Sequence, residues 1–178
     1  RSDAISVALI DFKKKNFECF EMLKDPEELS FEKSTNKSKS VVHLANIKGY
    51  YGNEGLKSHD KGNALEALDL LDISLEVAEK LQPYSVRKQV DTMTYYNAAI
   101  IAIQAKAHDR ALPYLNRYLE LKPQDETMHI KRMHIFTEKG DNDGFLAALE
   151  QSKETCKDCL GVIIEEINYY IDLDQMDK

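Results

Sequence analysis

The chain has 178 residues, of which 43% are hydrophobic and 31% are charged, and this balance is typical of a folded domain rather than of a disordered segment. Its formal net charge of −7 argues against a general nucleic-acid binder, because the neutralisation of phosphates requires a basic surface. No apolar run approaches the roughly 18 residues needed to cross a membrane, and the low content of seven Gly and four Pro favours helices over a turn-rich β fold.

The N-terminal part of the chain divides into two predicted segments. Residues 1–30 are interpreted as a degenerate helical hairpin whose turn is "KKKNFE". Residues 31–39 are polar and rich in Lys and Ser, which predicts a linker. Alternatively, Ser38 or Ser40 caps a long helix that continues through "VVHLANIKGYYGNEGLKS", and we favour a helix after Ser38 because Val42 and Ala45 keep helical spacing.

The middle of the chain predicts two helical hairpins, over residues 40–90 and 91–125. In the second, apolar residues recur at helical spacing on both sides of the polar break "AKAHDR", which has the length that joins antiparallel helices. Small residues stand where the two helices of each hairpin would touch, at Gly55 and Ala67 in the first and at Ala99 and Ala111 in the second.

The hairpin pattern recurs with a period of about 34 residues, a length that is a signature of solenoid repeats. The period carries Tyr95, Ala99 and Ala102 onto His129, Met133 and Phe136, and then onto Ile163, Ile167 and Tyr170. The first clear hairpin precedes the second by a longer interval, because extra residues surround "AEKLQPYSVRKQ". We predict further repeats at 126–159 and 160–178 within a single helical-repeat domain over 1–178. The last repeat lacks its second helix, and we therefore expect the chain to be a fragment of a longer repeat protein.

The order Tyr95, Tyr96, Asn97, Ala98, Ala99, Ala102, Ala111, Leu115 and Pro123 resembles the tetratricopeptide repeat. The match is strong over 92–125, good over 48–81 and degenerate over 126–159, where Phe145 replaces the small residue that opens the second helix. The resemblance implies an all-α, right-handed superhelix of antiparallel hairpins, a TPR-like α-solenoid. It also implies a concave groove, lined by the first helix of each hairpin, that binds peptides or partner helices.

Carried over residue by residue, the resemblance places the following side chains in the groove: Asn53, Leu56, Tyr96, Asn97, Ile100, Lys131, His134, Glu165 and Asn168. We therefore predict a non-catalytic scaffold that binds a protein or peptide. The alternatives are a structural unit that self-associates through the edge of its C-terminal helix, and a ligand-binding repeat domain of a larger protein. Asn97 and Lys131 match two positions of the clamp for chaperone C-termini, but Gly52 and Leu56 do not match the others, so we do not predict chaperone binding.

Residue patterns that would indicate catalysis or metal binding are weak. Cys156 and Cys159 form a CxxC in the turn between two predicted helices, without the preceding strand of a thioredoxin-like site and without two further zinc ligands. His129 and His134 are five residues apart and miss the spacing of paired helix ligands, and we expect His129 to be structural. We predict no enzyme activity, cofactor or metal site, and three cysteines do not establish the compartment.

Overall fold

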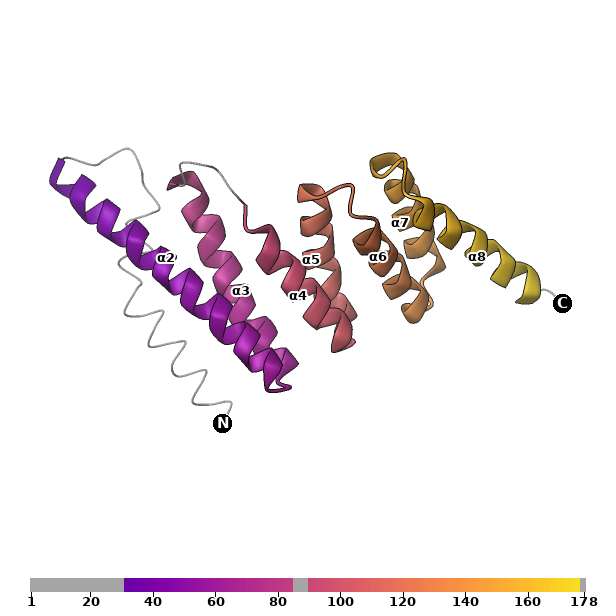
Figure 1. The fold of residues 1–178 in the computed structure, drawn as a ribbon, viewed down its shortest axis with the longest axis horizontal. Coiled ribbons are helices and arrows are strands. Elements are labelled where there is room, and N and C mark those ends of the chain that lie inside the picture. Colours follow the sequence, from indigo (N-terminus) through magenta and orange to yellow (C-terminus); the bar gives the residue numbers. More distant parts are fainter. Residues whose placement is uncertain (1–30, 85–89, 177–178) are drawn as a thin grey trace.

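The computed structural model describes residues 31–84 and 90–176, and this part of the chain contains helices and no strand (Figure 1). The predicted all-α class is therefore confirmed, while the hairpin predicted for 1–30 lies outside the described residues. The elements in chain order are α2 (Phe31–Asp60), α3 (Ala64–Leu81), the short 3-10 helix η1 (Gln82–Tyr84), α4 (Thr92–Gln104), α5 (His108–Leu121), α6 (Glu126–Lys139), α7 (Asn142–Thr155) and α8 (Leu160–Met176).

The helices pack as consecutive pairs, α2 with α3, α4 with α5 and α6 with α7, and α8 then packs against both α6 and α7 (Figure 1). The starts of α4, α6 and α8, at Thr92, Glu126 and Leu160, are equally spaced along the chain, and the starts of α5 and α7, at His108 and Asn142, repeat the same interval. The interval from α3 to α5 is longer, because α3 is longer than α5 and is followed by η1. The spacing read from the sequence is thus the spacing of the helix pairs.

The linker predicted for residues 31–39 is wrong, because α2 begins at Phe31 and runs for 30 residues. Neither of the two sequence interpretations placed the start of this helix so early. The stretch contains no Gly or Pro, and its Lys and Glu residues have good helix propensity, so its polar composition is compatible with a helix.

Small residues allow close contact within the first two pairs of helices. Ala99 on α4 and Ala111 on α5 are completely buried in the main apolar core. At Gly55 on α2, an added Cβ would lie 2.9 Å from Cγ of Leu71 and 3.1 Å from the carbonyl oxygen of Ala67. The α2–α3 pair therefore depends on the absence of a side chain at Gly55.

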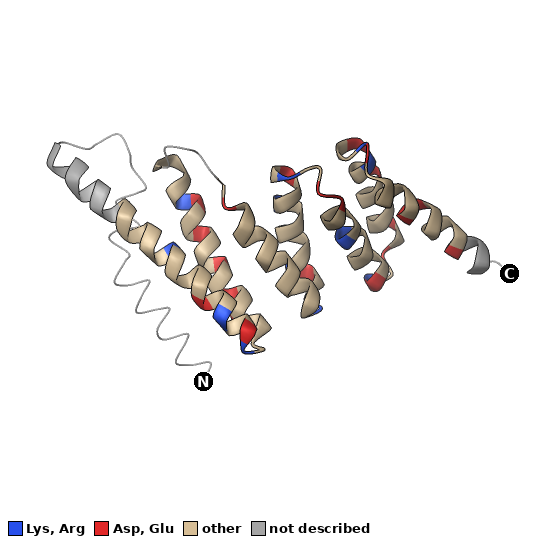
Figure 2. Ribbon diagram, viewed as in Figure 1, with Lys and Arg blue, Asp and Glu red and all other residues tan. Residues whose placement is uncertain are grey.

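Charged residues are distributed along the whole row of helices, but not evenly. Acidic and basic residues are interspersed from α2 to α7, whereas the described part of α8 carries acidic residues only (Figure 2). The charged surface of the described chain therefore changes character at its C-terminal helix.

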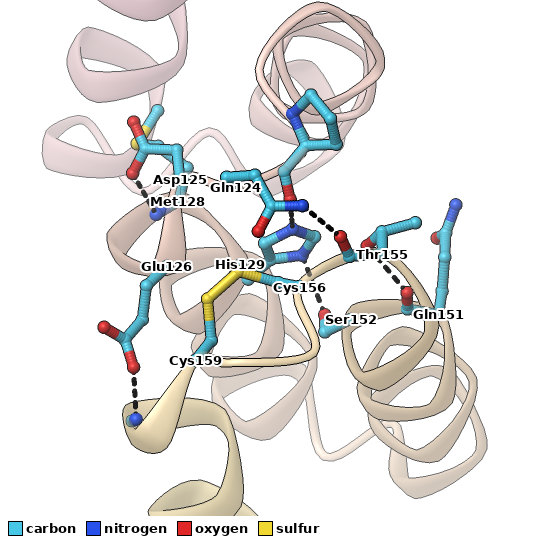
Figure 3. The surroundings of a disulfide bond; sticks show 12 residues. Gln124, Asp125, Glu126, Met128, His129, Gln151, Ser152, Thr155, Cys156 and Cys159 are labelled. Carbon is cyan, nitrogen blue, oxygen red and sulfur yellow. Dashed lines mark hydrogen bonds between the residues drawn. A yellow bond between two sulfur atoms is a disulfide. The ribbon is translucent and has the colours of Figure 1, made fainter.

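Several contacts hold α8 against the preceding hairpin. A disulfide joins Cys156, at the end of α7, to Cys159, just before α8 (Figure 3). Glu126 on α6 accepts a hydrogen bond from the backbone N–H of Gly161. Phe145 on α7 stacks on Tyr169 of α8 with ring centroids 4.5 Å apart. Because Phe145 replaces a small residue at this point of the repeat pattern, it fills space that α8 closes.

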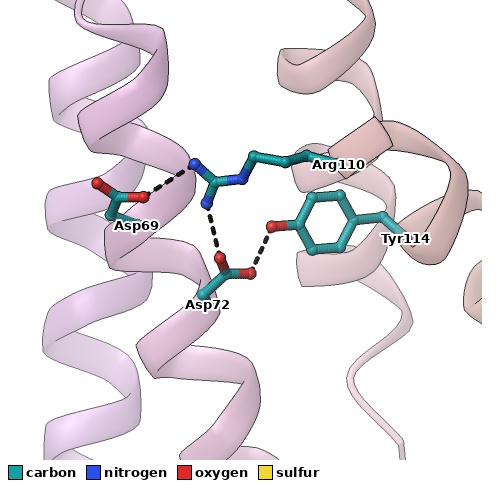
Figure 4. Close-up of polar contacts among 4 residues, drawn as sticks. All are labelled: Asp69, Asp72, Arg110 and Tyr114. Atoms are coloured by element: carbon teal, nitrogen blue, oxygen red, sulfur yellow. Dashed lines mark hydrogen bonds and ion pairs between the residues drawn. The ribbon is translucent and has the colours of Figure 1, made fainter. Parts of the chain in front are cut away.

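A polar network links α3 to α5 across neighbouring hairpins (Figure 4). The guanidinium of Arg110 donates to Asp69 at 2.8 Å and to Asp72 at 2.6 Å, and the hydroxyl of Tyr114 also donates to Asp72. Half-exposed ion pairs of this kind contribute little net stability. The network therefore serves mainly to align one hairpin on the next.

Candidate partner-binding surface

The nine residues predicted to contact a partner all lie on α2, α4, α6 and α8, which we call the first helices. We call the surface formed by these nine side chains the first-helix surface. Two rows of equivalent positions compose it, each advancing by one repeat from one first helix to the next, with Tyr96 beside them: Asn53, Asn97, Lys131 and Glu165 in one row, and Leu56, Ile100, His134 and Asn168 in the other.

The apolar members of this surface are partly used for packing. The ring of Tyr96 lies 5.5 Å from that of Tyr118 on α5, and both Tyr96 and Ile100 pack against the main core. Leu56 on α2 is 38% exposed. Tyr96 and Ile100 thus offer one edge each to a partner, while Leu56 is more freely accessible.

Two members from different hairpins meet directly. Nε2 of His134 on α6 lies 3.2 Å from a carboxylate oxygen of Glu165 on α8. His134 is more than half exposed and Glu165 is only 22% exposed. A protonated imidazole would neutralise the carboxylate at this point, so the contact links the C-terminal end of the surface to the preceding hairpin.

Four polar members form no hydrogen bond or ion pair through their side chains within residues 31–84 and 90–176. They are Asn53 on α2, Asn97 on α4, Lys131 on α6 and Asn168 on α8. Asn53 and Asn168 are exposed, and the other two are half-buried. Each first helix therefore presents one amide or ammonium group whose bonding capacity the described chain leaves unused.

A buried polar cluster between α6 and α7 was not predicted. Arg132 is 3% exposed and donates to Gln151 at 2.7 Å, to Ser152 at 3.1 Å and to the carbonyl oxygen of Ala148 at 3.2 Å. Burial lowers its pKa. The clue in the sequence was a cation inside the apolar pattern of α6, three residues after His129.

His129 belongs to the same cluster and is 1% exposed, in agreement with the structural role expected for it. Its Nε2–H donates to the carbonyl oxygen of Pro123 at 2.9 Å, and its Nδ1 lies 2.9 Å from the hydroxyl of Ser152 (Figure 3). Burial lowers the pKa of the imidazole, and the nearby Arg132 acts in the same direction. Both nitrogens are therefore engaged inside the chain, where they maintain the packing of α6 on α7.

A pocket of about 370 Å³ lies between α2, the end of α3 and the start of α4, and none of the nine predicted residues lines it. Lys48 and Asp91 form an ion pair of 2.6 Å at this pocket. Burial alone would raise the pKa of Asp91, but hydrogen bonds from Lys48 and from the Thr94 backbone hold it below its ordinary value. Asp91 is thus a helix cap, and the extra length of this repeat was the sequence signal for the pocket.

Within the described ranges, no group of three or more His, Cys, Asp or Glu residues could hold a metal ion. Of the helices in those ranges, none has the length and apolarity required to cross a bilayer. Comparison with models of protein families finds none that matches this chain, and a search among curated proteins finds no match either. The functional argument therefore rests on the geometry of the helices and on the groups that they leave unpaired.

Proposed function

We propose that the described helices form a tetratricopeptide-like, right-handed superhelix that acts as a non-catalytic scaffold and binds an extended peptide segment through the first-helix surface. The regular spacing of the helix starts supports this arrangement, because repeats that each contact only their neighbours build a continuous surface. In this proposal the first helices line the concave side, and the chain binds its partner without large rearrangement.

The observation that carries the proposal is the set of four unpaired polar side chains, one on each first helix. Amide groups of Asn53, Asn97 and Asn168 can each pair with both a C=O and an N–H of a peptide backbone. Lys131 adds a single positive charge between them and selects a peptide with an acidic group. The exposed part of Tyr96 supplies an aromatic anchor, the residue type that often dominates binding energy at interfaces.

The proposal is tested with two matched double variants. Asn97→Ala with Lys131→Ala removes two unpaired groups from the first-helix surface, and neither change breaks an internal bond in the described part of the chain. Lys122→Ala with Asn142→Ala makes the same two replacements at exposed positions after α5 and at the start of α7. Circular dichroism verifies that both variants keep the helix content of the parent chain.

Peptides are selected from a random peptide library displayed on phage, and their affinities are measured by fluorescence anisotropy. We expect selected peptides to bind the Asn97/Lys131 variant at least about tenfold more weakly, a loss of about 1.4 kcal/mol. The Lys122/Asn142 control should bind as the parent chain does. Selection of no consensus peptide, or equal affinity for the two variants, would show that this surface is not the binding site.

A further inference from the structure

An apolar stripe runs along the exposed side of α8. Its members occur three or four residues apart and therefore share one face of the helix. Their exposed fractions lie between 43% and 71%. We call this face the α8 stripe, and it consists of Leu160, Ile163, Ile164, Ile167, Tyr170 and Ile171. The other side of α8 is occupied, since Val162 is 1% exposed and Tyr169 stacks on Phe145 of α7.

The α8 stripe corresponds to the face by which the earlier first helices contact their second helices. Ala99 on α4 and Met133 on α6 occupy the positions equivalent to Ile167, and both are completely buried, whereas Ile167 is 53% exposed. The same contrast holds between His129, which is 1% exposed, and Ile163, which is 43% exposed. The α5 and α7 helices cover this face in the earlier pairs. The shape of the α8 stripe is therefore that of a site for one α-helix.

The charges beside the α8 stripe are all negative in the part of α8 whose side chains the structure describes. Glu165, Glu166 and Asp172 are its ionisable groups other than tyrosine, and no Lys or Arg accompanies them (Figure 2). Glu166 pairs with Lys153 of α7 at 2.9 Å, and Asp172 remains exposed. At about 100° per residue, Glu166 and Asp172 lie on opposite sides of the stripe.

We propose that the α8 stripe binds an amphipathic helix of a partner protein, with apolar residues every three to four positions and with Lys or Arg beside them. The six side chains offer roughly 500 Å² of apolar surface, which is the size of patch that marks an interaction site on a monomer. The carboxylates favour a basic helix over a second copy of this chain, since α8 packed on α8 would bring the same negative groups together. This helix site uses a different face of α8 from Glu165 and Asn168 of the first-helix surface.

The direct test uses three synthetic peptides of 17 residues, the length of α8. The first has a Leu and Ile stripe flanked by Lys, the second replaces each Lys by Glu, and the third keeps the Lys-rich composition but scrambles the stripe. Each peptide carries a fluorophore, and its binding to the whole chain is followed by anisotropy. We expect the first peptide to bind at least about tenfold more tightly than either of the others.

Two matched variants locate the site. Ile163→Ser with Ile167→Ser should weaken binding of the Lys-flanked peptide at least about tenfold. Val42→Ser with Leu65→Ser replaces two side chains of similar exposure, 58% and 61%, on α2 and α3, and should leave binding unchanged. Circular dichroism establishes that both variants are folded.

Equal binding of the three peptides would overturn the proposal, as would an Ile163/Ile167 variant that binds as the parent chain does. Sedimentation equilibrium tests the competing occupant. A chain that dimerises without peptide, and becomes monomeric with Ile163→Ser and Ile167→Ser, would assign the stripe to a second copy and refute the proposal. None of these substitutions touches Asn97 or Lys131, so failure here is distinct from failure of the proposed peptide-binding function.

Discussion

The glycines of α2 provide a test of how closely α2 and α3 are packed. Gly49 and Gly55 lie in the same helix, six residues apart, and neither has the positive φ that only glycine adopts readily. An added Cβ at Gly49 would have no neighbour within 4 Å, whereas at Gly55 it would meet Leu71 at 2.9 Å and a backbone oxygen at 3.1 Å. The two positions therefore differ in space rather than in secondary structure.

Replacement of either glycine by alanine should gain about 1 kcal/mol from helix propensity. At Gly49 this gain is unopposed, and we expect the free energy of unfolding to rise by about that amount. At Gly55 the overpacking of Leu71 and Ala67 should cost about 1–3 kcal/mol, because a well-packed core cannot absorb a new methyl group without displacement. The net result expected for Gly55→Ala is a loss of up to about 2 kcal/mol.

Both variants are compared with the parent chain by urea denaturation, followed by circular dichroism at the helix band. The expected result is a higher midpoint for Gly49→Ala and a lower one for Gly55→Ala. Equal stabilisation by the two substitutions would refute the reasoning, since it would mean that α2 and α3 do not approach each other as closely at Gly55 as the structure indicates.

Two further predictions concern the hairpin that precedes α8. Phe145→Ala should lower the free energy of unfolding by about 3–5 kcal/mol, because the ring is 3% exposed and its loss leaves a cavity against Tyr169; in the same urea assay, a cost below about 1 kcal/mol, as for an exposed residue such as Tyr170, would contradict this packing. His129 has a folded-state pKa below its ordinary value of 6.5, so the unfolded chain binds the proton more readily and stability should fall as the pH drops below 6.5. His129→Gln keeps an N–H for the Pro123 carbonyl and should reduce this fall between about pH 7.5 and 5.5, measured as the difference in unfolding free energy between the two pH values; an unchanged pH dependence would exclude His129 as its source.

Much of the fold could be predicted from local patterns. Apolar residues at helical spacing place the helices, and small residues such as Ala99 and Ala111 mark where paired helices touch. The start of α2 could not be predicted in this way, because residues 31–39 have the composition of a linker yet continue a helix. Polar composition reports on exposure to water, and an exposed segment can be either helix or coil.

For the candidate site, the sequence could supply positions but not partners. The repeat spacing was sufficient to place all nine residues on the first helices, although the superhelix and its ligand stay predictions. It could not show that His134 meets Glu165, or that Arg132 is buried among Ser152 and the carbonyl of Ala148. These contacts join different helices, so they depend on how one hairpin lies on the next.

The sequence by itself determined the helix pairs, the regular interval between them and the positions that need small side chains, because these features follow from the local periodicity of a helix and from side-chain size. Only the tertiary structure decided which polar groups are used internally and which apolar groups remain uncovered. Ile167 and Met133 occupy equivalent positions in the pattern, yet one is half exposed and the other is buried. The difference arises because a second helix covers Met133, and burial is a property of the neighbouring helix as much as of the residue itself.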